Sequence, residues 1–229
     1  MAKMKGFLPP RNPSRDYTVT SPSLVRLSGI AKSLPKLLLT NRISITIDSL
    51  KKDDLAIDKL IIKKEDQDLR LAMVQLSFIA HAYIWGCDRP REKLPEALAK
   101  PWVQVAELLG RPPILSYASY CIDNWFLIDK DEPISLENVA LITNFLGGID
   151  EDWFVTVHVC IENAAAGAIE AAETISRCRS DNSDQQIINP LNQIRDSLLD
   201  VNKTFSRMTE RCDPYIYYNR VRPFIFGSK

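Results

Sequence analysis

A regular apolar stripe near the carboxyl end of the sequence constrains the fold more than any other feature. Its members follow one another at intervals of three or four residues: Leu191, Ile194, Leu198, Val201, Phe205 and Met208. A helix with about 3.6 residues per turn places all of them on one side. Because such a stripe is stable only when it packs against other apolar surface, we predict that this segment belongs to a helical bundle.

Other segments also predict helices, so the fold class is expected to be mainly α with a minor β component. Residues 67–85 are apolar on several sides and end at Gly86, which indicates a buried helix. A second helix is expected to begin at Pro101 and end before a glycine. A third is expected over about 152–177, and its middle is a run of alanine and glycine that another helix or a flat ligand can approach closely.

Local signals predict the remaining structure. Residues 1–36 are rich in proline and serine and indicate an extended arm. Apolar and polar residues alternate over 43–47, which predicts a short strand or, alternatively, a helical turn. Capping residues predict the bounds of three further helices. The first would start at Ser135 and end at Gly147-Gly148, and the second would start at Asn189-Pro190. The third, a last short helix, would start at Asp213-Pro214, and Pro223 would kink or end it.

Two domains are expected on either side of a polar, proline-containing stretch. Residues 1–127 would form a small domain that includes the arm. Residues 128–135 would form the linker, and 136–229 a second, helical domain. A chain of 229 residues can bury a sound core in either arrangement.

Charge and composition argue against several classes of protein. The 29 basic and 29 acidic residues leave no net charge, so no nucleic-acid partner is expected. The apolar runs are too short for a bilayer, and the first residues lack the apolar stretch of a signal peptide, so no membrane association is expected. The five cysteines show no metal-ligand spacing, and free thiols in the cytoplasm are the expected state.

The residues that carry chemistry are few. The sequence contains two histidines, and His81, within an apolar helix, is expected to be a hydrogen-bonded core residue. His158 shares a helix face with Phe154, where either a structural or a functional role is open. Tyr218 and Arg222 are four residues apart, and arginine beside aromatic rings either binds a carboxylate or forms a surface cation–π pair.

The sequence around these residues resembles the indoleamine 2,3-dioxygenase family. Six stretches carry the resemblance in order: GFLP at 6–9, HAYIWG at 81–86, LPEALAKPW at 94–102, PPILSYASYCIDNW at 112–125, WFVTVHVCIENAAAGAI at 153–169 and YYNRVRPFIFG at 217–227. The resemblance implies haem b held between groups of helices and insertion of dioxygen across the indole C2–C3 bond of tryptophan. The product would be N-formylkynurenine, the first compound of tryptophan breakdown through kynurenine.

The resemblance also implies roles for individual residues. Tyr117, Tyr120 and Cys121 would hold the indole ring, with Phe154 as an aromatic wall. Arg222 would pair with the substrate carboxylate, and His158 would occupy the distal position, where it could hydrogen-bond the indole N–H or bound oxygen. The other expected substrate contacts are Tyr217, Tyr218 and Ile225.

The iron ligand is the main departure from the family pattern. The family's proximal histidine lies beyond the part of the pattern that this sequence matches, so no metal ligand is expected in the chain. Residues 136–229 would then be the first helices of the large domain, with an apolar face exposed. A homodimer or a second polypeptide could complete the bundle.

Two alternatives to the dioxygenase hypothesis stay open. One is a haem-free binding or structural relative that dimerises through the exposed helical face. The other is a haem monooxygenase of indoles, which would add one oxygen atom instead of two.

Overall fold

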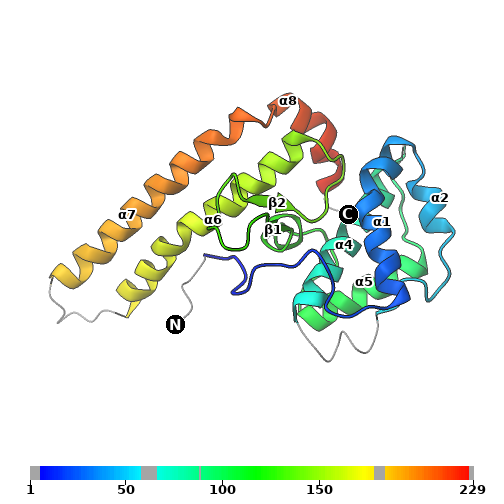
Figure 1. Cartoon of the computed structure of the whole chain (residues 1–229), viewed down its shortest axis with the longest axis horizontal. Coiled ribbons are helices and arrows are strands. Elements are labelled where there is room, and N and C mark those ends of the chain that lie inside the picture. The colour runs from blue at the N-terminus through cyan, green and yellow to red at the C-terminus, as the bar shows by residue number, and fades with distance from the viewer. Residues whose placement is uncertain (1–5, 58–65, 88, 178–183, 227–229) are drawn as a thin grey trace.

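The computed structural model describes residues 6–57, 66–87, 89–177 and 184–226, and helices dominate these ranges (Figure 1). The two strands found there, β1 (Trp125–Leu127) and β2 (Val139–Leu141), pair antiparallel, with Trp125 opposite Leu141. The predicted fold class, mainly α with a minor β component, is confirmed.

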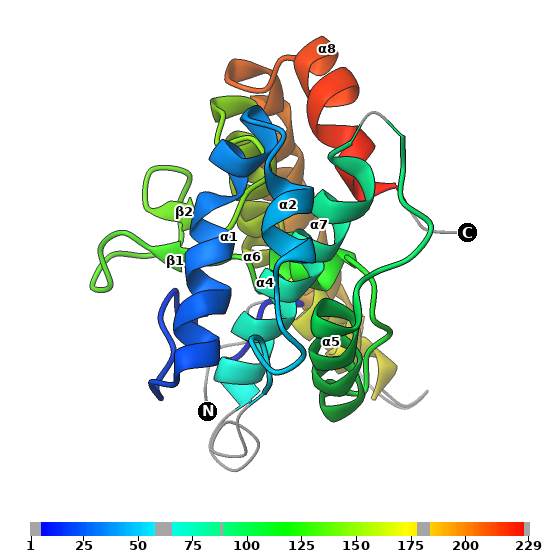
Figure 2. The same cartoon turned by 90° about the vertical axis from the view of Figure 1, so that its right-hand side faces the viewer.

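The helices form two groups. One surrounds a central helix and contains α1 (Pro22–Leu39), α2 (Ile43–Asp48), α4 (Asp66–Trp85) and α5 (Glu96–Leu109). The other is the long antiparallel pair α6 (Ile149–Ser176) and α7 (Asp184–Ser206), which extends away from the first group (Figure 1). Figure 2 shows the first group in front of this pair. After α7, the chain turns through α8 (Pro214–Ile216) and returns to α4.

Helix α4 is the centre of the core, as its apolar sequence predicted. Its side chains are buried from Leu71 to Tyr83 almost without interruption. Phe78, in its middle, is fully buried and packs against Phe145 and Tyr120, with ring centroids 4.6 and 5.7 Å apart. A helix that is apolar all round needs neighbours on every side, and α1, α2, α5 and the carboxyl-terminal segment provide them.

The alternating segment at 43–47 is a helix, so the strand prediction is wrong and the helical alternative is confirmed. Ile43 and Ile47 are four residues apart and fully buried, whereas Ile45 points outward and is 63% exposed. A strand would have placed all three isoleucines on one face. The core accepts a pair at helical spacing because α1 and α4 lie beside this turn.

Prolines mark helix starts less reliably than expected. Pro101 lies inside α5, which begins five residues earlier at Glu96, and Pro190 lies inside α7. Both rings are buried, so packing offsets the backbone hydrogen bond that proline cannot make. The start at Asp213 is confirmed, because its carboxylate accepts hydrogen bonds from the backbone N–H groups of Tyr215 and Ile216.

The helix expected to begin at Ser135 is absent from the described chain, and β2 occupies part of that segment. Asn138 explains the difference, since its amide donates to the carbonyl oxygens of Asp129, Glu132 and Pro133. Its side chain thereby fixes the loop that joins β1 to β2 and competes with helical hydrogen bonding. The stretch proposed as a linker, 128–135, lies in this loop.

The extended arm is shorter than predicted, because α1 occupies 22–39. Ahead of α1, the described residues lie along α4 and are fixed by polar contacts. Thr18 donates from its backbone N–H to buried Asp68 at 2.9 Å, and Tyr17 donates to Gln75 Oε1 at 2.9 Å. The arm is therefore part of the fold.

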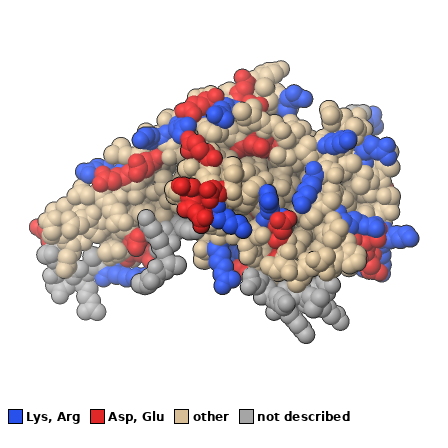
Figure 3. Space-filling model, in the orientation of Figure 1, with Lys and Arg blue, Asp and Glu red and all other residues tan. Residues whose placement is uncertain are grey.

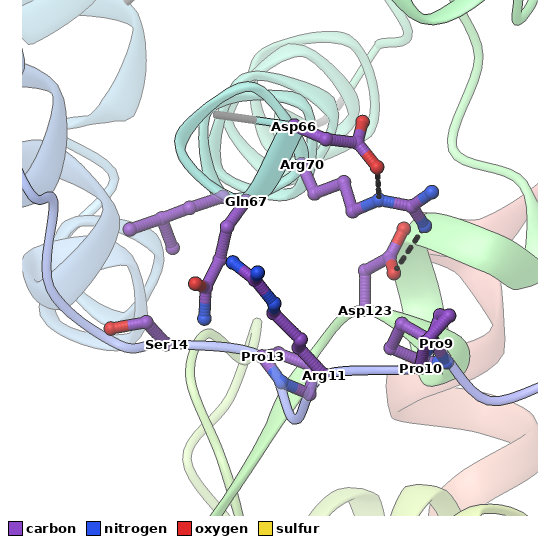
Figure 4. A pocket seen from close by; sticks show the side chains of 10 residues that line it. Pro9, Pro10, Arg11, Pro13, Ser14, Asp66, Gln67, Arg70 and Asp123 are labelled. Carbon is purple, nitrogen blue, oxygen red and sulfur yellow. Dashed lines mark hydrogen bonds and ion pairs between the residues drawn. The ribbon is translucent and has the colours of Figure 1, made fainter. Parts of the chain in front are cut away.

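A small pocket of about 250 Å³ lies between the arm and α4 (Figure 4). There Arg70 donates to Asp66 at 2.7 Å and to Asp123 at 3.1 Å. Arg111 donates to the other oxygen of Asp123 at 2.6 Å. Asp123 is buried and directly follows the segment that carries Tyr120, so this network fixes one end of that segment.

The apolar stripe of α7 lies at the edge of its contact with α6. The contact is close because α6 has small side chains, and a Cβ on Gly167 would lie 2.6 Å from Ser197 Oγ. The inner stripe residues, such as Ile194 and Val201, are half-buried. The outer ones are exposed: Leu191, Leu198 and Phe205. Within the described residues the stripe is therefore packed only in part, and its outer members form an exposed apolar face of the kind expected for residues 136–229.

The visible surface carries acidic and basic side chains interspersed (Figure 3). Among the described helices, none combines the length and continuous apolar character that crossing a bilayer requires.

Candidate functional site

Three segments that are distant in sequence bring an aromatic cluster together. Helix α6 supplies Phe154 and His158, whose rings lie 4.2 Å apart. The π-helical turn η3 (Tyr217–Val221) supplies Tyr217, which stacks on Phe154 at 4.1 Å. The π-helical turn η1 (Ala118–Ile122) supplies Tyr120, whose hydroxyl lies 3.3 Å from that of Tyr217. These segments meet where α6 begins and the chain returns from α7.

A pocket of about 420 Å³ opens beside this cluster, and five predicted substrate-binding residues line it. They are Phe154, Tyr217, Tyr218, Arg222 and Ile225. The Arg222 guanidinium lies 4.9 Å from the centre of the Tyr218 ring, so the cation–π pair considered from the sequence is present. Both side chains are exposed, so the guanidinium can still reach an anionic group in the pocket.

The remaining predicted residues do not line this pocket. Tyr117 is half-exposed, donates to Glu162 Oε1 at 3.0 Å, and has its ring 6.0 Å from that of His158. Cys121 is buried beside Tyr120 in η1. Neither Tyr117 nor Cys121 is part of the pocket lining, whereas Phe154 and Tyr217 are.

Burial keeps three tyrosines and one thiol at the site neutral. Burial raises the pKa of Tyr120 and of Tyr217 above the usual tyrosine value, and burial is also the main cause of the raised pKa of Cys121. Burial likewise raises the pKa of Tyr117, and the nearby Glu162 carboxylate adds to the shift. A neutral aromatic wall with a guanidinium at its mouth suits an apolar ring that carries a carboxylate.

The hydrogen bond of His158 fixes the form of its ring. Nδ1 lies 2.7 Å from the carbonyl oxygen of Phe154, and a carbonyl oxygen can only accept. Nδ1 therefore carries a hydrogen, and in the ring form protonated only at Nδ1 the other nitrogen, Nε2, is an acceptor. Within the described ranges Nε2 has no hydrogen-bond partner, so it could accept from a ligand N–H.

Three candidate iron ligands among the described residues, His81, Cys160 and Cys212, are unsuited to bind haem iron. Both ring nitrogens of His81 are hydrogen-bonded within the protein, to Phe224 and Leu115, so His81 cannot ligate iron. Burial raises the pKa of the Cys160 thiol to about 12 and that of Cys212 to about 11, so neither is the thiolate that iron binds. In the part of the chain described here, no group of three potential metal ligands occurs.

The sequence did not single out several residues at this site. Met208, Thr209, Cys212 and Pro214 complete the pocket lining. Glu151, fully buried at the start of α6, influences the pKa of Tyr120 and of Tyr217. The acidic residues ahead of the apolar run at 153–161 were a signal for a helix start, but they did not indicate that one of them is buried.

A mainly helical protein with a pocket of aromatic rings and one arginine fits the class that binds a flat apolar ligand bearing an anionic group. The comparison with family models is more specific, because the model for indoleamine 2,3-dioxygenase matches residues 1–229. The chain belongs to the indoleamine 2,3-dioxygenase family.

Individual relatives agree with this assignment. The indoleamine 2,3-dioxygenase of Saccharomyces cerevisiae is 32% identical over 97% of this chain and 50% of its own length. Indoleamine 2,3-dioxygenase 1 of Rattus norvegicus is 32% identical over 87% of this chain and 48% of its own length. Human indoleamine 2,3-dioxygenase 2 is 31% identical over 87% of this chain and 48% of its own length. The chain thus spans about half the length of these relatives.

Proposed function

We propose that this chain forms the substrate-binding part of an indole dioxygenase whose substrate is tryptophan or a close relative. The observation that carries the proposal is the pocket in which Arg222 lies beside the stacked rings of Phe154 and Tyr217. The rings would hold the indole, and the guanidinium would pair with the carboxylate. The membership of the family supports an oxidation of the indole ring.

His158 would orient the indole. Its Nδ1 donates to the Phe154 carbonyl, so Nε2 of the singly protonated ring would accept a hydrogen bond from the indole N–H. The aromatic rings around it would exclude water from the bound ring. The proposed role is the first of the two roles that the resemblance implied.

If His158 binds the indole, haem b on this chain would require a different iron ligand, which His81, Cys160 and Cys212 do not provide. The exposed residues of α7, among them Leu198 and Phe205, support a further polypeptide or a second copy at that face. The same exposure favours the second candidate function, a haem-free binding protein that dimerises.

The described cysteines are free thiols, which supports the cytoplasm as the proposed location.

Replacing Arg222 by glutamine is expected to weaken tryptophan binding about 10- to 100-fold, because charge-assisted hydrogen bonds contribute about 1.5–3 kcal/mol. Isothermal titration calorimetry should show no change for tryptamine, which lacks the carboxylate. Arg220→Gln is the matched control, since Arg220 is exposed two residues away and does not line this pocket. If wild type binds neither compound, the proposed function is wrong, and the dimeric binding protein becomes the better hypothesis.

Replacing His158 by alanine is expected to weaken tryptophan binding about fivefold, the effect of losing a hydrogen bond of about 1 kcal/mol. The N1-methyl derivative of tryptophan has no indole N–H and should bind the two proteins equally. A loss of the same size for both ligands would assign His158 a packing role instead.

With an active preparation, counting the oxygen atoms added to the product separates dioxygenase from monooxygenase.

A further inference from the structure

His81 connects two segments of the site, although it lies in the core on α4. Its Nδ1 lies 2.8 Å from the carbonyl oxygen of Phe224, and its Nε2 accepts from the backbone N–H of Leu115 at 3.2 Å. The carbonyl needs a donor and the N–H needs an acceptor, so the ring is the neutral tautomer protonated at Nδ1. Burial lowers the pKa of His81, which agrees with the neutral form.

The two bonded backbone groups belong to the two segments that supply most of the predicted site. Phe224 lies between Arg222 and Ile225, both of which line the pocket. Leu115 lies just before Tyr117 and the η1 turn. Phe224 is 143 positions from His81 in the sequence, and Leu115 is 34 positions from it. One imidazole therefore holds together segments that have no local connection.

From this geometry we infer that His81 is a positioning residue, which sets the placement of Arg222 relative to the aromatic wall. The inference concerns the pocket of the proposed function and rests on that function only for the identity of the ligand. His81 touches no part of the pocket itself, because it is not among the lining residues. It acts through the backbone of the segment that carries Arg222 and Ile225, which it joins to the segment that carries Tyr117 and Tyr120.

The surroundings of His81 make it a rigid support. Trp102 lies edge-on to the imidazole at 6.3 Å, and its indole N–H donates to Ser77 Oγ at 3.0 Å. The Phe224 ring stacks on Phe145 at 4.9 Å, and Phe145 in turn contacts Phe78 of α4. The segment around Phe224 is thus held to α4 by ring packing, and His81 adds the directional bond that fixes its backbone.

Three variants separate the two hydrogen bonds. In His81→Asn the amide N–H₂ can replace Nδ1 and keep the bond to Phe224. In His81→Gln the side-chain oxygen can replace Nε2 and keep the bond to Leu115. His81→Leu keeps neither hydrogen bond and therefore shows the effect of losing both. The two amide variants remain informative if the leucine variant does not fold.

Hydrogen–deuterium exchange by mass spectrometry tests the connection without any ligand. We expect His81→Leu to raise exchange about tenfold in peptides covering 114–117 and 222–226. His81→Asn should raise it only over 114–117, and His81→Gln only over 222–226. Unchanged exchange at both segments in His81→Leu would contradict the inference.

Ligand binding distinguishes positioning from a general structural role. In wild type, calorimetry gives the ratio of affinities for tryptophan and tryptamine, which reports the placement of Arg222. This ratio should fall about tenfold in His81→Leu and His81→Gln and be restored in His81→Asn. Raised exchange with an unchanged ratio would mean that His81 only stabilises the fold, and would overturn the inference. If wild type binds neither ligand, the proposed function fails, and the segment-specific exchange pattern alone decides whether His81 positions the two segments.

Discussion

Exchanging Asp123 for asparagine is expected to lower the free energy of unfolding by about 3 kcal/mol. Asp123 is 1% exposed and accepts hydrogen bonds from Arg70 at 3.1 Å and Arg111 at 2.6 Å. Asparagine keeps the shape but removes the charge, which leaves the partly buried Arg111 guanidinium without its counter-ion and leaves Arg70 with only the exposed Asp66. Urea unfolding followed by circular dichroism measures the change.

A matched control is available on the same arginine. Asp66 also binds Arg70, at 2.7 Å, but its side chain is 61% exposed, so Asp66→Asn should cost less than about 1 kcal/mol. Equal losses in the two variants would show that burial of Asp123 is not the source of the stability. Because Asp123 follows η1, we also expect Asp123→Asn to loosen Tyr120 in the site.

Replacing Glu151 by glutamine is expected to change how stability depends on pH. The Glu151 carboxylate is fully buried and accepts backbone hydrogen bonds from Phe145 at 2.8 Å and Leu146 at 2.9 Å. Burial raises its pKa to about 7, and these hydrogen bonds only partly oppose the effect. The carboxyl group therefore ionises in the folded protein at a higher pH than in the unfolded chain.

The sign of the effect follows from proton binding. Between the ordinary pKa of 4.5 and the folded value of about 7, the folded state holds a proton that the unfolded state has released. The resulting stability is complete below pH 4.5 and is lost as the pH rises through about 7. From about pH 4 to about pH 8, wild type should lose about 3 kcal/mol relative to Glu151→Gln.

Glutamine at the exposed Glu170 of the same helix provides the control, and its pH profile should follow that of wild type. Free energies of unfolding measured by urea titration at several pH values give the comparison. Parallel curves for wild type and Glu151→Gln would mean that the backbone hydrogen bonds outweigh burial and that Glu151 is already ionised in the acidic range.

Features set by the local sequence were predicted well. The continuous apolar character of α4 identified a buried helix, and Asp213 with Pro214 identified the start of α8. The period of the apolar stripe identified α7 as a helix. The spacing of Tyr218 and Arg222 anticipated their cation–π contact. These features depend on residues within a few turns of one another, and helical geometry fixes such contacts.

Features that depend on distant partners were predicted poorly. Pro101 and Pro190 lie inside helices because packing offsets a missing hydrogen bond. Asn138 replaced an expected helix with a hairpin loop through its side-chain hydrogen bonds. The short segment around Ile45 is helical because two neighbouring helices cover one of its sides.

The sequence by itself determined that this protein is mainly helical, that His81 is a core residue and that its motifs resemble those of indoleamine 2,3-dioxygenases. Only the tertiary structure decided which site residues meet: it stacks Phe154 on Tyr217 and places both beside Arg222. It also revealed the burial of Glu151 and the two hydrogen bonds of His81. Periodicity and caps are local properties, whereas burial and side-chain pairing depend on how segments far apart in the chain pack together.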